Sequence, residues 1–337
     1  MATSASRPLR VGVFGIGALG RHHTRILSRF EDVALAGIFD PRADVAALVA
    51  SEHGARVATS FEDLAGRIDA AVLAAPTSLH GELGLALLGR GVHLLVEKPI
   101  ASTLAEADAL IAAADARGVI LAVGHVEFHN PAVQALLDAG SEPRFIEIER
   151  LGTFSPRSLD VDVILDLMIH DLQILQAMDP SPVVEVRAIG IPVLSERIDI
   201  ANARLAFASG LVANVTASRV SGERVRKLRA FFRDRYVSLD YQAQEIKGYR
   251  LELAGGTRSI LPANPPVERA EPLRCELAAF VAACRGETVR QVDGRAGRRA
   301  LATALEVVAA AAPLPAVASA APVAPEEAPV RGSAGLC

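Results

Sequence analysis

The sequence predicts an α/β protein, with an N-terminal Rossmann domain and then an α+β domain that has a large open, mostly antiparallel sheet. Short apolar runs alternate with helical stretches from residue 9 to residue 123, which is typical of βαβ units around a parallel sheet. A glycine-rich turn, GIGALG, follows the first run, where such a domain has its first tight turn. After Gly124 the strand-like runs follow one another with few helices between them, which is typical of antiparallel pairing.

The first domain is predicted at residues 1–125. Its apolar runs do not alternate with polar residues, as expected of parallel strands that are covered on both faces. Gly54, Gly91 and Gly118 follow helical stretches and are suited to end them. The predicted strands are 9–14, 33–39, 69–75, 92–96 and 119–123, and the predicted helices are 22–30, 42–53, 78–90 and 104–117.

The second domain is predicted at residues 126–312. Ser209 and Gly210 separate two strand-like runs and indicate a hairpin turn. Residues 313–337 are dominated by Pro, Ala, Val and Gly without any period, so we expect a disordered tail. The predicted strands are 145–151, 183–189, 198–207, 211–218, 227–232 and 236–241, and the predicted helices are 131–139, 161–178, 273–284 and 294–312.

Composition excludes several classes of protein. With 337 residues, 51% hydrophobic content and a net charge of −4, the chain can build a core and lacks the basic excess of a nucleic-acid or anionic-membrane binder. Its apolar stretches fall short of the ~18 residues of a transmembrane helix, and the N-terminus lacks a signal-peptide core. The three cysteines have neither disulfide nor metal-ligand spacing. We expect a protein of the reducing cytosol without a metal site.

The glycine-rich turn and the end of the second strand together predict a dinucleotide site. The glycines permit a tight turn and close approach to a pyrophosphate at a helix N-terminus. Asp40 ends the second strand about 20 residues later, where an acidic residue binds the ribose hydroxyls. Asp40 favours NAD over NADP, although Arg42 could face a phosphate; the alternative is a glycine turn beside an unrelated acid. The expected cofactor residues here are Gly15, Ile16, Gly17, Ala18, Leu19, Gly20, Asp40, Pro41 and Arg42.

The tripeptide Glu97-Lys98-Pro99 follows the predicted strand 92–96. The carboxyl ends of parallel strands line the ligand crevice of such a sheet, so these side chains are expected to face a bound cofactor. Lys98 can donate to a substrate oxygen on which charge develops. A surface Glu-Lys pair at a strand end is the alternative.

A carboxylate and an imidazole share one face of the predicted helix 161–178. Asp166 and His170 are four residues apart, so we expect them side by side. A neighbouring carboxylate raises the basicity of an imidazole, which suits a general base that takes the proton of an alcohol. A buried histidine that Asp166 merely satisfies is the alternative.

Taken together, these motifs resemble the glucose–fructose oxidoreductase/inositol dehydrogenase (Gfo/Idh/MocA) family over residues 8 to about 312. The resemblance is carried by GIGALG, APTSLH (75–80), GVHLLVEKPI (91–100) and DLMIH (166–170). It implies an open sheet that forms a homodimer or homotetramer, and catalysis by Lys98, Asp166 and His170. It also implies further cofactor contacts from Pro76, Thr77, His80, Glu97 and Lys98.

Two longer segments, GHVEFHNPAV (124–133) and DVDVILDLMIHDL (160–172), resemble the branch of that family that acts on UDP-N-acetylglucosamine and related sugars. That branch oxidises the sugar 3-hydroxyl for a PLP-dependent aminotransferase, in some members on the way to lipid A. The resemblance implies substrate contacts from His125, Glu127 and Asn130. The arginine expected directly after Glu127 is absent, because Phe128 stands there.

Seven basic residues lie between 219 and 235. Alternating charges on strands usually mark a solvated face. The alternative is that Arg224 and Arg226 bind a substrate diphosphate.

The sequence therefore predicts an NAD-dependent dehydrogenase of a sugar hydroxyl, most specifically the 3-hydroxyl of a UDP-sugar. A dehydrogenase of a free sugar or polyol such as inositol remains open, and so does a catalytically silent dinucleotide-binding regulator, because fold alone does not determine function.

Overall fold

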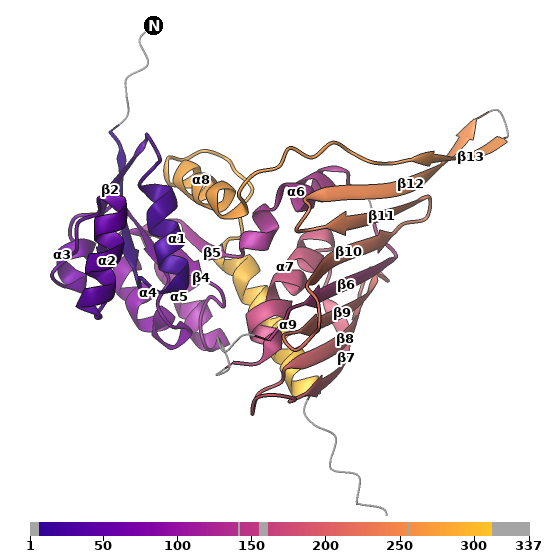
Figure 1. The fold of residues 1–337 in the computed structure, drawn as a ribbon, viewed down its shortest axis with the longest axis horizontal. Coiled ribbons are helices and arrows are strands. Elements are labelled where there is room, and N and C mark those ends of the chain that lie inside the picture. The colour runs from indigo at the N-terminus through magenta and orange to yellow at the C-terminus, as the bar shows by residue number, and fades with distance from the viewer. Residues whose placement is uncertain (1–6, 141, 155–160, 255–256, 312–337) are drawn as a thin grey trace, which may run out of the picture.

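The computed structural model describes residues 7–140, 142–154, 161–254 and 257–311. The predicted tail at 313–337 lies outside these ranges. In the described part, the strands form two sheets that lie side by side, with helices between them (Figure 1). The same ranges hold no helix that is both long and apolar enough to cross a membrane.

The first sheet is parallel and has the strand order β2-β1-β3-β4-β5. All of its strands except the edge strand β2 are mostly buried because helices cover both faces, which explains the unbroken apolar runs. The elements of this half are β1 (Leu9–Phe14), α1 (Ala18–Leu27), β2 (Val33–Phe39), α2 (Ala43–His53), α3 (Phe61–Ala65), β3 (Ala70–Leu73), η1 (Thr77–Leu79), α4 (His80–Leu88), β4 (His93–Glu97), α5 (Leu104–Arg117) and β5 (Leu121–Gly124).

The second sheet has the order β13-β12-β11-β10-β6-β9-β8-β7, and only the β6–β9 pair among these is parallel. This confirms the predicted fold class. The elements of this half are η2 (Val126–His129), α6 (Pro131–Asp138), β6 (Phe145–Leu151), η3 (Ile164–Met168), α7 (Ile169–Met178), β7 (Val183–Ile191), β8 (Ile200–Phe207), β9 (Val212–Ser218), β10 (Val225–Phe231), β11 (Arg235–Asp240), β12 (Glu245–Ala254), β13 (Thr257–Pro262), α8 (Pro272–Cys284) and α9 (Gly294–Ala310).

One face of this sheet packs on helices and the other does not. Strand β6 shows why, because Ile146 and Ile148 point inward while Glu147 and Glu149 point outward. The inward side chains form one core with α6, α7 and α9. Of the described helices, none covers the outer face (Figure 1).

The structure corrects three details of the sequence prediction. The short helix α3 and the strands β12 and β13 were not predicted. The helix predicted at 161–178 is two segments, since the π-helical turn η3 precedes α7. This junction lies between Asp166 and His170, so a simple α-helical spacing does not describe the pair.

Candidate active site

The glycine-rich turn between β1 and α1 is shaped for close approach of an anion. Gly15 has φ +83°, and a Cβ on Gly20 would lie 1.9 Å from the Gly15 carbonyl oxygen, so both positions require glycine. A Cβ on Gly17 would meet nothing within 4 Å. Gly17 caps α1 without a side chain, and the first turn of α1 has no acidic residue. The helix N-terminus is thus open to a negatively charged group, as a dinucleotide pyrophosphate requires.

Asp40 holds this turn in place. Its Oδ2 accepts a hydrogen bond from the Ile16 N–H at 2.7 Å, and both of its carboxylate oxygens accept from the Arg42 guanidinium at 2.9 and 3.1 Å. Burial opposes the ionisation of Asp40, but these hydrogen bonds outweigh it and lower its pKa. Arg42 and Pro41 are exposed. A ribose hydroxyl could replace the exposed Arg42 guanidinium on Asp40 without disturbing the bond to Ile16.

The loops after β3 and β4 lie at the same carboxyl edge of the first sheet as the glycine-rich turn. Pro76 and Thr77 lie at the accessible start of η1. His80 is buried, and its ring nitrogens lie 2.9 Å from the carbonyl oxygens of Ala75 and Pro99, so it ties the two loops together.

Glu97 is turned into the protein. Its Oε1 lies 2.7 Å from Nε2 of the buried His23, and its Oε2 accepts the Lys98 N–H at 3.2 Å. A Cβ on Gly124 would lie 2.9 Å from that Oε2, so the glycine leaves room for the carboxylate. Glu97 therefore fixes the backbone from which Lys98 extends, and His23 is a partner that the motif analysis missed.

Lys98 and Asp166 form an ion pair across the two halves of the chain. The Lys98 Nζ donates to the Asp166 carboxylate at 3.0 Å and to the Asp166 carbonyl oxygen at 2.5 Å. Among the described residues the ring of His170 makes no hydrogen bond, and its Nδ1 is buried without a partner. The structure thus brings all three predicted residues together, but the Asp166 carboxylate binds Lys98 and not the ring of His170.

The expected rise in the basicity of His170 is wrong. Burial lowers the pKa of His170 well below its usual value, and the positive charge of Lys98 lowers it further. The Asp166 carboxylate is paired with Lys98, so it does not compensate for the loss of water around the ring. The imidazole is consequently neutral at neutral pH.

His125 lies against the edge of His170, with ring centroids 5.4 Å apart and an interplanar angle of 87°. It is fully buried, and neither ring nitrogen has a partner in the described structure. Burial, together with the charge of Lys98, lowers the pKa of His125 to about 3. A second neutral imidazole with unused hydrogen-bonding capacity therefore adjoins the first.

A buried ionic cluster lies next to His170. Arg150 donates to both carboxylate oxygens of Asp171 at 2.7 Å and to Glu127 at 2.8 Å. Arg226 also donates to Glu127, at 3.0 Å. Sequence reasoning missed Arg150, although the alternation of β6 places it on the inward face, where a charged residue needs a buried partner.

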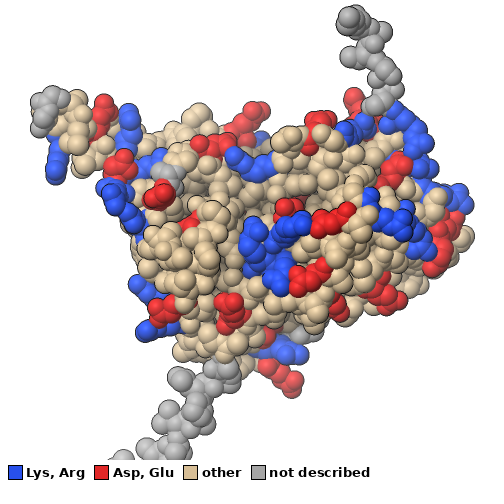
Figure 2. Space-filling view, turned by 180° about the vertical axis from the view of Figure 1, so that it is seen from behind, with Lys and Arg blue, Asp and Glu red and all other residues tan. Residues whose placement is uncertain are grey.

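The remaining predicted substrate residues differ in their surroundings. The side-chain Oδ1 of Asn130 accepts from the Ala132 N–H at 3.0 Å, and its Nδ2 donates to the Tyr241 backbone carbonyl at 2.9 Å, so the fold uses both ends of the side-chain amide. Arg224 is exposed and has no ion pair within the described structure. Arg219, the first member of the basic cluster, is instead buried against Asp199 at 2.8 Å. On the face shown in Figure 2, basic side chains lie beside acidic ones.

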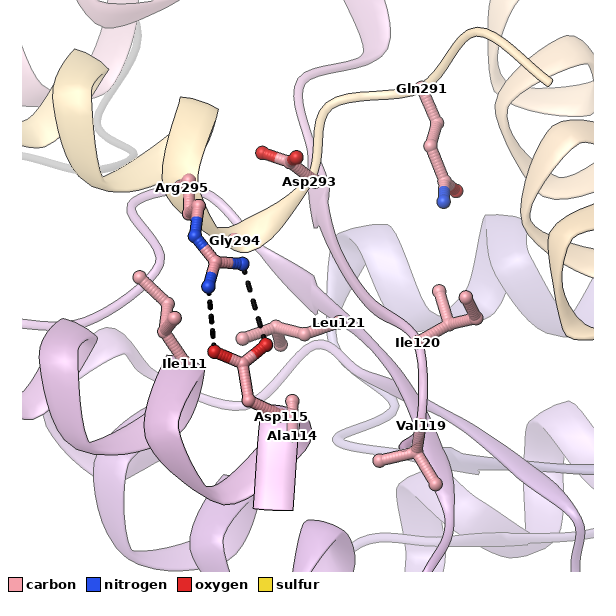
Figure 3. A pocket seen from close by; sticks show the side chains of 10 residues that line it. All are labelled: Ile111, Ala114, Asp115, Val119, Ile120, Leu121, Gln291, Asp293, Gly294 and Arg295. Carbon is pink, nitrogen blue, oxygen red and sulfur yellow. Dashed lines mark hydrogen bonds and ion pairs between the residues drawn. The ribbon is translucent and has the colours of Figure 1, made fainter. Parts of the chain in front are cut away.

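A separate small pocket of about 170 Å³ lies where α5 and β5 meet the start of α9 (Figure 3). Two hydrogen bonds between Arg295 and Asp115, of 3.4 and 2.7 Å, cross one side of it. Its lining contains none of the predicted site residues. The pocket marks a junction between the two halves of the chain and not the candidate active site.

Comparison with known proteins identifies the family of this chain. Residues 9–125 match the family model described as "Oxidoreductase family, NAD-binding Rossmann fold", Gfo/Idh/MocA. A UDP-N-acetylglucosamine 3-dehydrogenase of Acidithiobacillus ferrooxidans is 40% identical over 302 residues, which cover 89% of this chain and 96% of that protein. This chain belongs to the Gfo/Idh/MocA oxidoreductase family. It is thus an oxidoreductase with an NAD-binding Rossmann domain, and the resemblance inferred from its motifs is confirmed.

Solved structures extend the likeness to the whole fold. The structure of GnnA, the UDP-N-acetylglucosamine 3-dehydrogenase from A. ferrooxidans, has a TM-score of 0.84 at 39% identity and covers 90% of this chain and 97% of its own. A levoglucosan dehydrogenase in complex with NADH and levoglucosan has a TM-score of 0.80 at 18% identity, covering 91% and 98%, and shares the fold alone. A myo-inositol 2-dehydrogenase of Thermotoga maritima is 28% identical over 232 residues, 63% of this chain and 69% of that protein.

Proposed function

We propose that this oxidoreductase uses NAD to oxidise the 3-hydroxyl of UDP-N-acetylglucosamine, or of a related UDP-sugar, to a ketone. The observation that carries the proposal is the 40% identity to a UDP-N-acetylglucosamine 3-dehydrogenase over nearly the full length of both chains. The inositol dehydrogenases are more distant. The grouping of Lys98, Asp166 and His170 supports an alcohol oxidation at this place.

The side chains divide the proton chemistry between them. Neutral His170 takes the proton of the sugar hydroxyl. The Lys98 Nζ donates a hydrogen bond to the same oxygen and stabilises the negative charge that develops there, while Asp166 fixes the direction of the lysine. When bound, NAD supplies the hydride acceptor.

NAD is the proposed cofactor in preference to NADP. The turn at 15–20 would hold the pyrophosphate, and the Asp40 carboxylate would accept from the ribose hydroxyls and repel a phosphate. The lowered pKa of Asp40 supports this, because the carboxylate stays ionised at any pH at which the enzyme would work. The side of the cofactor site across from the glycine-rich turn would be formed by Pro76, Thr77 and His80.

The sugar nucleotide would bind between the Rossmann domain and the second sheet. His125 is fully buried against His170, so we expect it to support that ring and not to contact the sugar directly. Arg226 is partly exposed and shares Glu127 with Arg150, so its guanidinium can also meet a diphosphate, with Arg224 nearby in sequence.

Two partners complete the proposal. The uncovered face of the eight-stranded sheet would pair with a second copy in a homodimer or homotetramer, which light scattering would detect. The 3-keto product is a substrate for a PLP-dependent aminotransferase, as in the supply of diamino sugars for lipid A.

The test is NADH absorbance on mixing the protein with NAD and UDP-N-acetylglucosamine, with His170→Ala as the matched variant. We expect the wild type to produce NADH, and the variant to lose at least about 100-fold in turnover while binding NAD normally. Retained turnover in the variant would contradict the role of His170. Oxidation of free myo-inositol without oxidation of the UDP-sugar would favour the polyol alternative.

A further inference from the structure

Arg150 is an arginine on the buried face of β6, near the end of the strand. It follows Ile146 and Ile148 on the inward side of β6 and is 3% exposed. Its Nε and Nη2 bind the two carboxylate oxygens of Asp171, and its Nη1 binds Glu127. Its guanidinium carbon lies 5.1 Å from the centre of the Tyr241 ring. A buried charge with this many directed contacts holds its partners in one geometry.

The hydrogen bonds between Arg150 and Asp171 constrain His170 through the backbone. Asp171 is the next residue, and both lie in the first turn of α7, directly after the π-helical turn of η3. In the described structure the His170 ring has no hydrogen bond of its own to set its direction. Its orientation therefore depends on the backbone of this turn and on the edge contact with His125.

The cluster also sets the charge around the imidazole. Two guanidiniums, those of Arg150 and Arg226, face two carboxylates, those of Asp171 and Glu127, so the set is balanced. After burial, Lys98 and His125, these two arginines are further causes of the lowered pKa of His170. The other titratable groups nearby are His125 and the Lys98–Asp166 pair beside His170, His129 beside His125, and Tyr241 beside Arg150. Burial keeps both of these histidines neutral.

We propose that Arg150 is a positioning residue for His170. Clamped between Asp171 and Glu127, its guanidinium fixes the first turn of α7 and balances the charges buried behind the imidazole. This rests on the proposed role of His170 as the base.

The experiment compares Arg150→Gln, Asp171→Asn and the double variant R150Q/D171N. Arg150→Gln leaves two carboxylates against one guanidinium, so the charged imidazole gains stability and its pKa rises. The acidic limb of the kcat/KM profile should then move up by about one pH unit. The double variant restores the balance of charge, so its limb should return to the wild-type position. Its kcat should stay at least about tenfold low because the clamp is missing.

Two further measurements separate this proposal from the proposed function. Titration of the His170 ring by NMR of ¹³C-histidine-labelled protein, assigned with His170→Gln, reports the same pKa changes without any substrate. NADH binding, followed by fluorescence, should be unchanged in all variants. If wild type does not oxidise UDP-N-acetylglucosamine, the proposed function fails and the NMR titration still tests Arg150.

An unmoved titration of His170 in Arg150→Gln would overturn the charge-balancing role, and wild-type kcat in the double variant would overturn the positioning role. If Arg150→Gln does not fold, the charge-balanced double variant still decides the positioning role through kcat, with Asp171→Asn as the single-site comparison.

Discussion

At the scale of the residue, Gly17 and Gly20 look equivalent in the sequence but have different surroundings. A Cβ on Gly20 would lie 1.9 Å from a backbone oxygen, whereas one on Gly17 would meet no atom within 4 Å. The fold needs the glycine at 20. The free space at 17 has no use within the protein, and it lies where a pyrophosphate would approach the N-terminus of α1.

This difference makes the two positions a matched pair. Gly17→Ala should leave the melting temperature unchanged and weaken NADH binding at least tenfold, about 1.4 kcal/mol, because the methyl group occupies the phosphate cradle. Gly20→Ala should instead lower the free energy of unfolding by about 1–3 kcal/mol, because the backbone has to shift. Thermal unfolding and NADH fluorescence titration measure the two effects. Wild-type affinity in Gly17→Ala would mean that the cofactor does not use this space.

At the scale of the element, α8 is an amphipathic helix with one polar exception on its buried side. Leu277 and Phe280 pack into the core of the first sheet, but Glu276 is also buried, and neither of its carboxyl oxygens has a partner in the described structure. Burial raises the pKa of Glu276 well above its usual value of 4.5, and the charge of Glu97 adds to the effect. The carboxyl is thus stable in the folded protein mainly in its protonated form.

Because of Glu276 in this helix, the free energy of unfolding should decrease as pH rises. Between the usual pKa of 4.5 and the raised folded value, the folded state binds more protons than the unfolded state, so stability declines with pH across that window. Glu276→Gln removes the titrating group and should flatten this decline. Urea unfolding at pH 5, 7 and 9 measures it. An equally steep decline in the variant would assign the pH dependence to other groups.

At the scale of the whole molecule, the chain returns to the first sheet after building the second. Side chains of α8 join the core beside β1 and β3, and Val292 and Leu301 join the core on the other face. The Val123 N–H donates to the Val292 carbonyl at 2.9 Å, which pairs part of the edge strand β5. Arg298 of α9 also binds Asp108 of α5 through both carboxylate oxygens.

We therefore expect residues 1–125 to be incomplete as a folding unit. A fragment of this range would expose the surfaces that Leu277, Phe280 and Leu301 cover, each contributing about 1.5–3 kcal/mol by burial. It should unfold at a clearly lower temperature than the full chain, or with no cooperative transition. Circular dichroism on heating decides this. A fragment as stable as the full protein would show that the domain boundary at 125 is also a stability boundary.

The sequence by itself determined the features that depend on neighbours along the chain. Strand 33–39, helix 104–117 and strand 145–151 have the predicted ends, because their apolar runs are bounded by turn and capping residues. The glycine turn, Lys98 and the DLMIH segment were found because each is a short contiguous motif, at a strand end or within one predicted helix. These contiguous motifs were enough to identify the family.

Only the tertiary structure decided which side chains meet. Strands β12 and β13 were not predicted. In β12 the alternation of polar and apolar residues changes phase at Gly248, so Ile246 is buried whereas Leu251 and Leu253 are exposed. Ile260 of β13 is exposed as well, so neither strand has one consistent apolar face. Asp166 binds Lys98 because η3 lies beside the end of β4. Arg150 meets Asp171 because β6 packs against α7. Such pairings follow from the distance between elements in the folded chain, and a sequence separation of 21 or 68 residues carries no signal of that distance.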